Sequence, residues 1–150
     1  KKIADKIYIN ILSKSKMLIK DGYFEKVNFN SSFEIISILL IFNLKILKET
    51  KNNKYKHINN EIVKNFIEDL DKSLRIEGIG DMSIGKYVKK YVKKFYYRIK
   101  KIDPILKDYK NLDLINYLNS LKDINLKNTS DFANVLIKNY EIFKKNNKNI

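Results

Sequence analysis

Three acidic side chains, Glu68, Asp69 and Asp71, stand close together in the sequence and are the first candidates for chemistry. Clustered carboxylates can bind a metal ion or transfer protons. Neighbouring positions on a helix point in different directions, however, so these carboxylates do not converge on one point. A structural role, in which they pair with Arg75, Arg98 or nearby lysines, is therefore favoured over a metal site.

Other catalytic side chains are scarce. The single histidine, His57, lies in a polar stretch without a second metal ligand beside it, so we interpret it as a surface residue. The chain has no cysteine, which excludes disulfides, thiol catalysis and zinc–thiolate sites and fits a reducing compartment. We therefore predict no catalytic, cofactor-binding or metal-binding residue, and we do not expect an enzyme.

The segment Gly80–Tyr87 imitates a phosphate-binding loop, because Gly80 and the pair Gly85-Lys86 have the spacing of that motif. Tyr87 stands where serine or threonine must bind magnesium, and no predicted strand precedes the glycines. We therefore reject a nucleotide site. An anion could still bind at the N-terminus of the helix that follows.

The net charge of +14, from 31 Lys+Arg against 17 Asp+Glu, dominates the composition. It favours acidic partners: nucleic acid, an anionic membrane surface or an acidic protein. The length of 150 residues suits one domain, residues 1–150, and a hydrophobic content of 44% is enough for a core. Lysines recur among the first apolar positions, so the beginning of the chain does not resemble a signal peptide.

Apolar residues recur with a helical period along the chain, without a strand-like alternation or an internal repeat. We predict an all-α fold, a single-domain irregular bundle of about six helices. The first should span Ile3–Ile19, the second Phe33–Thr50 after a cap at Ser31 or Ser32, and the third should follow a cap at Asn59 or Asn60. The fourth should run from Ile84 and kink or end near Ile102, before Pro104, and the last two should begin at Asn111 and Thr129.

Two segments near the beginning of the chain need separate interpretations. The second helix has almost no polar face, but Glu34, Ser37, Asn43 and Lys45 interrupt an apolar run that is too short to cross a membrane, so we expect the central buried helix rather than a membrane anchor. Between the first two helices, Tyr23–Asn30 is predicted to be an irregular connector whose aromatic side chains pack onto the core.

The third and fourth helices are amphipathic, and a short turn joins them. Gly78 and Gly80 should end the third helix, and Ser83 should cap the fourth, with Asp81 near its positive end. The fourth helix carries lysines on the side opposite its apolar face. This lysine face is either a solvated surface or a binding surface. Its lysines are Lys86, Lys89, Lys90, Lys93, Lys94, Lys100 and Lys101.

Arg98 is the exception on the fourth helix, because it lies near the edge of the apolar face. A buried charge without a partner is costly, so Arg98 should form an ion pair. The nearest acidic candidates in the sequence are Asp69, Asp71 and Asp81.

The span Asp69–Arg98 resembles the signature of the ubiquinol-cytochrome c chaperone family, the assembly factors of the cytochrome bc1 complex. The resemblance is specific over this span, weak upstream at Tyr8 and Phe33–Lys48, and absent after Lys110. The matching residues are Asp69, Asp71, Ser73, Leu74, Arg75, Gly78, Ile79, Gly80, Asp81, Ser83, Ile84, Lys86, Val88, Lys89, Lys90, Phe95, Tyr96 and Arg98.

This resemblance implies a non-enzymatic chaperone that binds newly made cytochrome b and promotes assembly of the bc1 complex. It further implies a small partner protein, a place near the ribosomal exit, and no small-molecule substrate. The expected location is the cytoplasmic face of a bacterial inner membrane, or the matrix side of the mitochondrial inner membrane. The expected partner-binding residues are Asp69, Asp71, Arg75, Gly78, Gly80, Asp81, Ile84, Lys86, Lys89, Lys90, Tyr96 and Arg98.

A basic helical domain that binds nucleic acid or the ribosome is the alternative. Lysines can hold phosphates, and the aromatic side chains of Tyr96 and Tyr97 can stack on bases. Against it, the chain has only two arginines, Arg75 and Arg98, and arginine is the better reader of bases and phosphates. The charge also predicts weak, salt-sensitive contact with anionic membranes.

Overall fold

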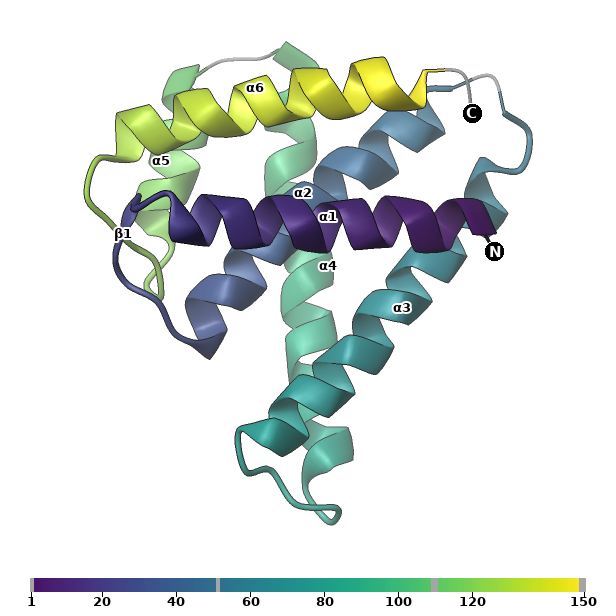
Figure 1. Ribbon diagram of the computed structural model, residues 1–150, viewed down its shortest axis with the longest axis vertical. Helices are drawn as coiled ribbons and strands as arrows, with labels where there is room; N and C mark the ends of the chain where they lie inside the picture. The colour runs from purple at the N-terminus through teal and green to yellow at the C-terminus, as the bar shows by residue number, and fades with distance from the viewer. Residues whose placement is uncertain (1, 51, 109–110, 149–150) are drawn as a thin grey trace.

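Six α-helices and one short two-stranded ribbon make up the computed structural model, which describes residues 2–50, 52–108 and 111–148 (Figure 1). The predicted all-α bundle is confirmed. In chain order the elements are α1 (Lys2–Lys20), β1 (Phe24–Lys26), α2 (Phe29–Lys48), α3 (Tyr55–Ile76), α4 (Ile84–Asp108), α5 (Asn111–Ser120), β2 (Asn125–Leu126) and α6 (Thr129–Asn147).

Helix α2 is the centre of the bundle and packs against α1, α3, α4 and α6. The prediction that this helix is too short to cross a membrane was wrong, because its 20 residues are long and apolar enough. Of the relevant window, however, 72% is buried inside the protein. This burial is the one expected of a core helix. Ile35, Ile38, Leu39 and Phe42 are completely enclosed.

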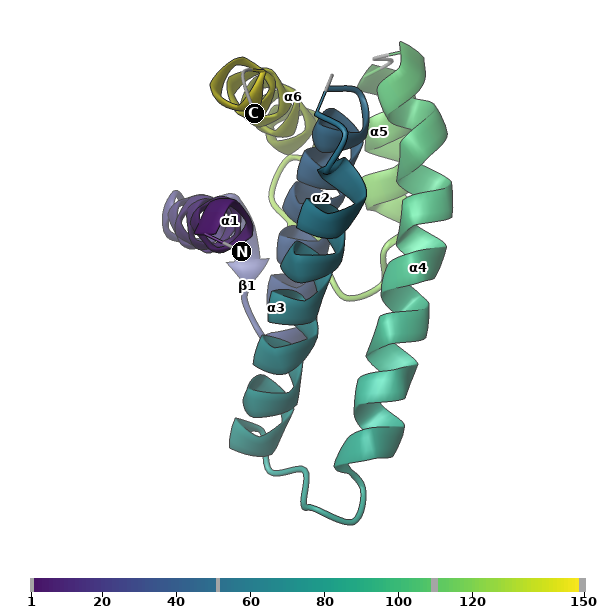
Figure 2. The same cartoon turned by 90° about the vertical axis from the view of Figure 1, so that its right-hand side faces the viewer.

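The helices form layers on either side of α2. Figure 2 shows α1 and α6 on one side of α2, and α4 and α5 on the other. Helices α3 and α4 pack against each other and extend together beyond the rest of the bundle, to the turn at the bottom of Figure 1. The long apolar row of α3 is buried along this pair, from Ile62 to Leu74.

The segment before α2 differs from the prediction. Asn28, not Ser31 or Ser32, caps the helix: its side chain accepts a hydrogen bond from the Ser31 N–H at 3.0 Å, and the Ser31 hydroxyl accepts one from the Asn28 N–H. Asparagine is as good a cap as serine, so the helix begins at Phe29, four residues earlier than predicted.

The predicted irregular connector is also partly regular, because Phe24 pairs antiparallel with Leu126 in the β1–β2 ribbon. Strands of three and two residues are too short to give an alternating sequence pattern. The aromatic side chains do pack inward as predicted. Tyr23 and Phe24 lie against Phe132, with ring centres 5.5 and 5.1 Å apart.

Two further boundaries were wrong. Helix α3 begins at Tyr55 and not after a cap at Asn59 or Asn60, so His57, which is exposed as predicted, lies in its first turn. Helix α4 does not end near Ile102 but continues through Pro104 to Asp108. Proline in a helix removes one backbone hydrogen bond, but Ile102 and Leu106 are both buried and hold α4 against the core on either side of it.

Candidate functional site

The α3–α4 tip, defined as residues 75–86, contains the turn between the two helices and is the part of the signature farthest from the bundle (Figure 1). Helix α3 ends in a Schellman motif, in which the Ile79 N–H donates to the Leu74 carbonyl at 3.1 Å and the Gly78 N–H to the Arg75 carbonyl at 3.0 Å. Gly78 has φ +102°, a conformation that favours glycine. Gly80 has no such positive φ, so the backbone at this position does not require glycine.

Arg75 fastens the tip through two carboxylates. Its Nε donates to Asp71 at 2.6 Å, one helical turn back, and its Nη1 donates to Asp81 across the turn. Both hydrogen bonds raise the pKa of Arg75, so the guanidinium stays charged. The predicted pairing of the acidic residues with Arg75 is confirmed for Asp71. The tip is therefore held by backbone bonds and by an exposed ion-pair cluster at the same time.

The tip also presents apolar side chains to solvent. Ile76 is 86% exposed and Met82 is fully exposed, although both are large hydrophobic residues. Between them, Ile79 packs against the core, and Ile84 is buried at the start of α4. Ile84 is therefore a packing residue, whereas Ile76 and Met82 are the exposed apolar side chains of the tip.

The lysine face of α4 begins beside the tip. Lys86, Lys89 and Lys90 are exposed, as predicted. Lys94 is different, because its Nζ lies 3.5 Å from a carboxylate oxygen of Asp123 and over the Tyr91 ring. Lys94 thus belongs to the packing of the bundle rather than to the free face.

Arg98 lies in another part of the protein and has a different partner from those predicted. Its Nε and Nη2 donate to the two carboxylate oxygens of Glu34 at 3.0 and 2.8 Å, which joins α4 to α2. The Glu34 side chain is 1% exposed and that of Arg98 is 15% exposed. Burial disfavours the charged guanidinium, but the hydrogen bonds and the charge of Glu34 outweigh it and raise the pKa of Arg98.

Two more predicted site residues are also away from the tip. Asp69 accepts a hydrogen bond of 2.7 Å from the Tyr8 hydroxyl, which joins α3 to α1. Tyr96 is half exposed on α4, next to the equally exposed Tyr97. At 1.5 Å per residue, Arg98 lies about 21 Å along the helix from Ile84. The structure therefore brings together Asp71, Arg75, Gly78, Gly80, Asp81 and Lys86, but not Asp69, Tyr96 or Arg98.

Sequence reasoning missed Ile76 and Met82. The signal was present for Ile76, because it follows Leu74 outside the buried row that runs from Ile62 to Leu74. Met82 is a large apolar residue between Asp81 and Ser83, in a turn where polar residues are expected. In the described ranges, no group of three or more His, Cys, Asp or Glu side chains is placed to hold a metal ion.

The model of a known protein family, described as ubiquinol-cytochrome c chaperone, matches residues 26–120, more than half of the chain. The chain belongs to the ubiquinol-cytochrome c chaperone family. The matched range includes the α3–α4 tip and runs from the last residue of β1 to the end of α5. No curated protein matches the sequence.

The crystal structure of the Cbp3 homolog from Brucella abortus has the same fold. The two structures agree with a TM-score of 0.76 at 20% sequence identity, over 95% of this chain and 81% of the other. Family membership supports a role as an assembly chaperone of the bc1 complex, and such a role implies no enzymatic reaction.

Proposed function

We propose that this chaperone binds newly made cytochrome b through the α3–α4 tip and promotes assembly of the bc1 complex without catalysing a reaction. The observation that carries the proposal is the pair Ile76 and Met82, two exposed apolar side chains on a turn that Arg75 holds in shape. They are the two most exposed large hydrophobic side chains among the described residues, and both lie in one short segment. Exposed apolar surface that is concentrated in one place marks a protein-binding site.

The chemistry of the tip suits a transient client. Methionine is unbranched and flexible, so Met82 can adapt to different apolar surfaces. The tip is small, and a small interface gives weak, reversible binding. A chaperone has to release its client, so a small, weakly binding contact suits this function better than a large, tightly binding one.

The charge around the tip suggests where the encounter takes place. Lys86, Lys89 and Lys90 are exposed in the first two turns of α4, at or next to the tip, and can attract acidic segments or an anionic membrane surface. We place the chaperone at the cytoplasmic face of the inner membrane, or on the matrix side in a mitochondrion. There it would meet the client near the ribosomal exit, together with a small partner protein.

Binding of RNA or the ribosome is the second candidate function, and the exposed side chains of Tyr96 and Tyr97 favour it. Both arginines, however, are already engaged within the protein, Arg75 with Asp71 and Asp81, and Arg98 with Glu34. Phosphate recognition would therefore rest on lysines alone, which act as point charges. This observation favours the protein client.

The test compares two matched double variants. Ile76→Ser with Met82→Ser removes the apolar pair of the tip, and Leu112→Ser with Ile142→Ser removes two exposed apolar side chains elsewhere. We expect only the first to reduce recovery of cytochrome b from solubilised membranes and accumulation of the bc1 complex. Equal recovery with both variants would contradict the proposal. Loss of RNA binding with normal bc1 assembly would favour the second candidate.

A further inference from the structure

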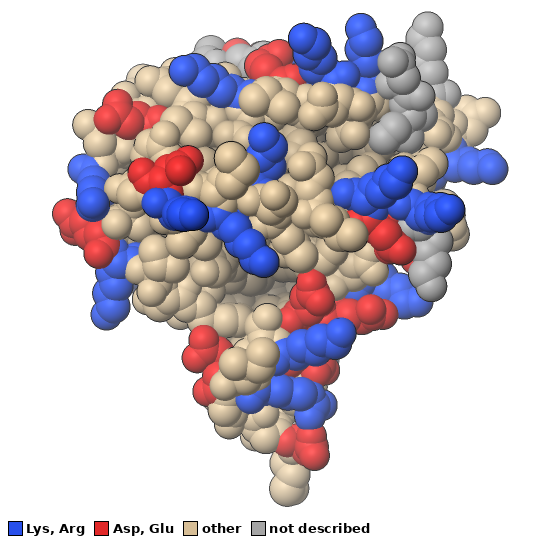
Figure 3. Space-filling view, viewed as in Figure 1, with Lys and Arg blue, Asp and Glu red and all other residues tan. Residues whose placement is uncertain are grey.

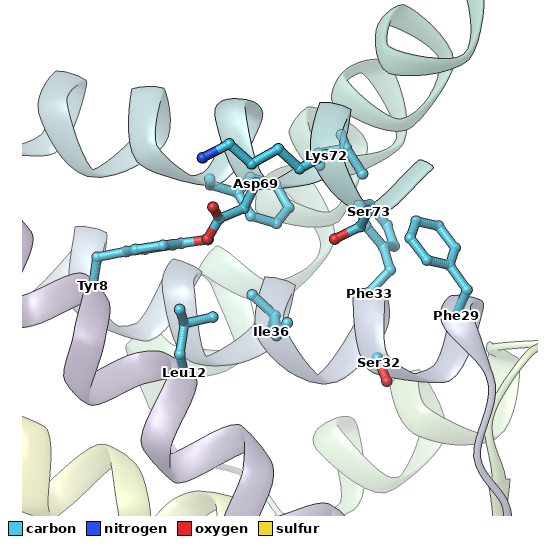
Figure 4. Close-up of a pocket in the computed structure, with 11 residues that line it drawn as sticks. Tyr8, Leu12, Phe29, Ser32, Phe33, Ile36, Asp69, Lys72 and Ser73 are labelled. Carbon is cyan, nitrogen blue, oxygen red and sulfur yellow. The ribbon is translucent and has the colours of Figure 1, made fainter. Parts of the chain in front are cut away.

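A cavity of about 190 Å³ opens between α1, α2 and α3, away from the two exposed apolar residues of the tip. Figure 4 shows Tyr8 reaching from α1 to Asp69 on α3, with Leu12 and Ile36 below them. The lining is mostly apolar. Its residues are Tyr8, Leu12, Phe29, Ser32, Phe33, Ile36, Phe66, Asp69, Leu70, Lys72 and Ser73.

The size and lining of the cavity suit one apolar side chain. A dry cavity of about 150 Å³ is large enough to bind benzene. Leu12, Ile36 and Phe29 line the cavity while they remain only partly buried, so their apolar surface is not fully used by the fold. A bulky aliphatic or aromatic group that enters would bury this surface, which is favourable.

An acidic shelf, defined as Asp5, Glu68 and Asp69, borders the cavity. These residues line a second hollow between α1 and α3, which shares Tyr8, Leu12 and Asp69 with the first. In Figure 3, red side chains gather at the hollow between α1 and α3. Within the part of the chain that the structure describes, none of the three carboxylates forms a salt bridge.

The shelf is unusual in its setting, because the whole chain carries a net charge of +14. Asp5 and Asp69 keep their positions through neutral donors: the Asn65 amide donates to Asp5 at 2.9 Å, and the Tyr8 hydroxyl donates to Asp69 at 2.7 Å. The carboxylates therefore keep their charge available for a cation from outside. Lys72 is the cationic residue among those that line the cavity, and it competes with such a ligand.

We propose that this α1–α3 groove binds a protein segment in which a bulky apolar residue is closely followed by lysine or arginine. The apolar residue enters the cavity, and the basic residue lies on the acidic shelf. Membrane proteins carry this combination where an apolar span meets its positively charged cytoplasmic flank. Assignment of the segment to a membrane-protein client rests on the proposed function, whereas the chemistry of the groove does not.

The first test uses a short fluorescein-labelled peptide with Leu-Leu-Phe followed by Lys-Arg-Lys, and measures fluorescence anisotropy. A basic peptide is repelled by most of this +14 chain, so binding reports a local site. We expect Ser73→Phe, which fills the cavity, to weaken binding about tenfold, since it excludes one apolar side chain. Unchanged affinity in a folded Ser73→Phe variant would overturn the proposal.

Charge is tested separately. Asp69→Asn with Glu68→Gln keeps an oxygen for the Tyr8 hydroxyl but removes two negative charges, and should weaken binding about threefold at low salt. Glu141→Gln with Asp131→Asn, on the exposed face of α6, is the matched control and should not. Lys72→Gln should tighten binding. Equal effects of the two acidic double variants would show that only net charge matters and would overturn the shelf.

A measurement on the unaltered protein covers the case in which Ser73→Phe does not fold. The peptide should shift the methyl NMR signals of Leu12 and Ile36 and leave those of Leu112 unchanged. Shifts confined to the tip would place the peptide there and overturn the groove. A dimer of the free protein in which the methyl signals of Leu12 and Ile36 show that the groove is covered, and which the peptide cannot displace, would assign the groove to a second copy and overturn the proposal.

Different experimental results would contradict the groove proposal and the proposed function. The variant Ile76→Ser with Met82→Ser should bind the peptide normally, because the tip lies outside the groove. Peptide binding that disappears in Ser73→Phe, without any loss of bc1 assembly, would support the groove as a site and contradict only its assignment to the client. Peptide binding lost in the tip variant alone would overturn the groove.

Discussion

The two arginines of the chain lie in opposite environments. Arg98 joins α4 to α2 through the side chain of Glu34, which is 1% exposed. Arg75 joins the end of α3 to the turn after it, through Asp71 and Asp81, and all three side chains are well exposed. We call the first region the α2–α4 junction, defined by Glu34 and Arg98. The second is the α3–α4 tip described above.

The difference separates residues that maintain the fold from residues that shape a surface. Two charges buried together lose their hydration, and either one becomes very unfavourable if its partner is removed. An exposed pair keeps most of its hydration and contributes little to stability. The same residue type therefore serves folding at the α2–α4 junction and local geometry at the tip.

The largest predicted effect comes from breaking the junction. Arg98→Ala should reduce the free energy of unfolding by about 3–5 kcal/mol, because it leaves the Glu34 carboxylate buried without a cation. Chemical denaturation of the purified protein measures this value. A midpoint equal to that of the wild type would mean that the junction is no more important than a surface pair.

The matched control replaces both charges. Glu34→Leu with Arg98→Met should be much more stable than Arg98→Ala, since no unpaired charge stays in the interior and the volume is kept. If the double variant were as unstable as Arg98→Ala, the two positions would contribute through side-chain shape and not through charge.

The partner of Arg98 shows where sequence reasoning reaches its limit. The helical period placed Arg98 at the edge of the apolar face and required a pair, and the structure confirms both. The helical period could not identify the partner, because Glu34 is 64 residues away in the sequence. Glu34 also lies on a helix whose burial is predictable from its apolar residues but whose neighbours are not. Element types follow from local patterns, whereas contacts between helices depend on how they pack.

The next effect concerns the shape of the tip and compares two neighbouring glycines. Gly78→Ala should cost about 1–2 kcal/mol, because alanine is strained at the positive φ of this position. Gly80→Ala should stay within about 1 kcal/mol of the wild type, since its backbone is ordinary and an added Cβ meets nothing within 4 Å. Thermal unfolding distinguishes them. Equal losses would mean that the turn does not depend on the Schellman geometry.

The candidate site was predictable only in part, for a related reason. The family signature located the turn, and Gly78 in the sequence predicted that α3 ends there. Local sequence sets Ile76 and Met82 apart, because one lies outside the buried row of α3 and the other lies in a turn. That α3 and α4 carry both side chains beyond the rest of the bundle depends on how the helices pack. Helix α2 shows the converse, because its apolar composition was enough to predict its burial in the core.

A smaller effect is expected for the exposed arginine. Arg75→Ala should leave the melting temperature close to that of the wild type, because solvent replaces its two exposed ion pairs. Client recovery should nevertheless fall, since the turn is no longer held between Asp71 and Asp81. Arg75→Lys keeps the charge without the two-pronged geometry and is the control. Destabilisation as large as that of Arg98→Ala would remove the distinction between the two regions.

The smallest effect on stability, and the sharpest test of the tip as a surface, comes from its lysines. Lys86→Glu with Lys90→Glu should change the free energy of unfolding by no more than about 0.5 kcal/mol, because both side chains are exposed and form none of the ion pairs of the described residues. The Lys90 Nζ lies 6.0 and 5.9 Å from the Tyr87 and Tyr91 ring centres, at the limit of a cation–π contact. Circular dichroism checks helix content and melting. Lys100→Glu with Lys101→Glu, farther along the same helix, makes the same charge change away from the tip.

If the tip holds the client, only the Lys86 and Lys90 variant should reduce recovery of cytochrome b and accumulation of the bc1 complex, because charge is reversed beside Ile76 and Met82. Equal losses with the Lys100 and Lys101 variant would indicate a general charge effect along α4, as a nucleic-acid surface produces, and RNA binding measured in parallel would then fall with both. Normal recovery with both variants would mean that the lysine face of α4 is a solvated surface, and that the apolar pair alone distinguishes the tip.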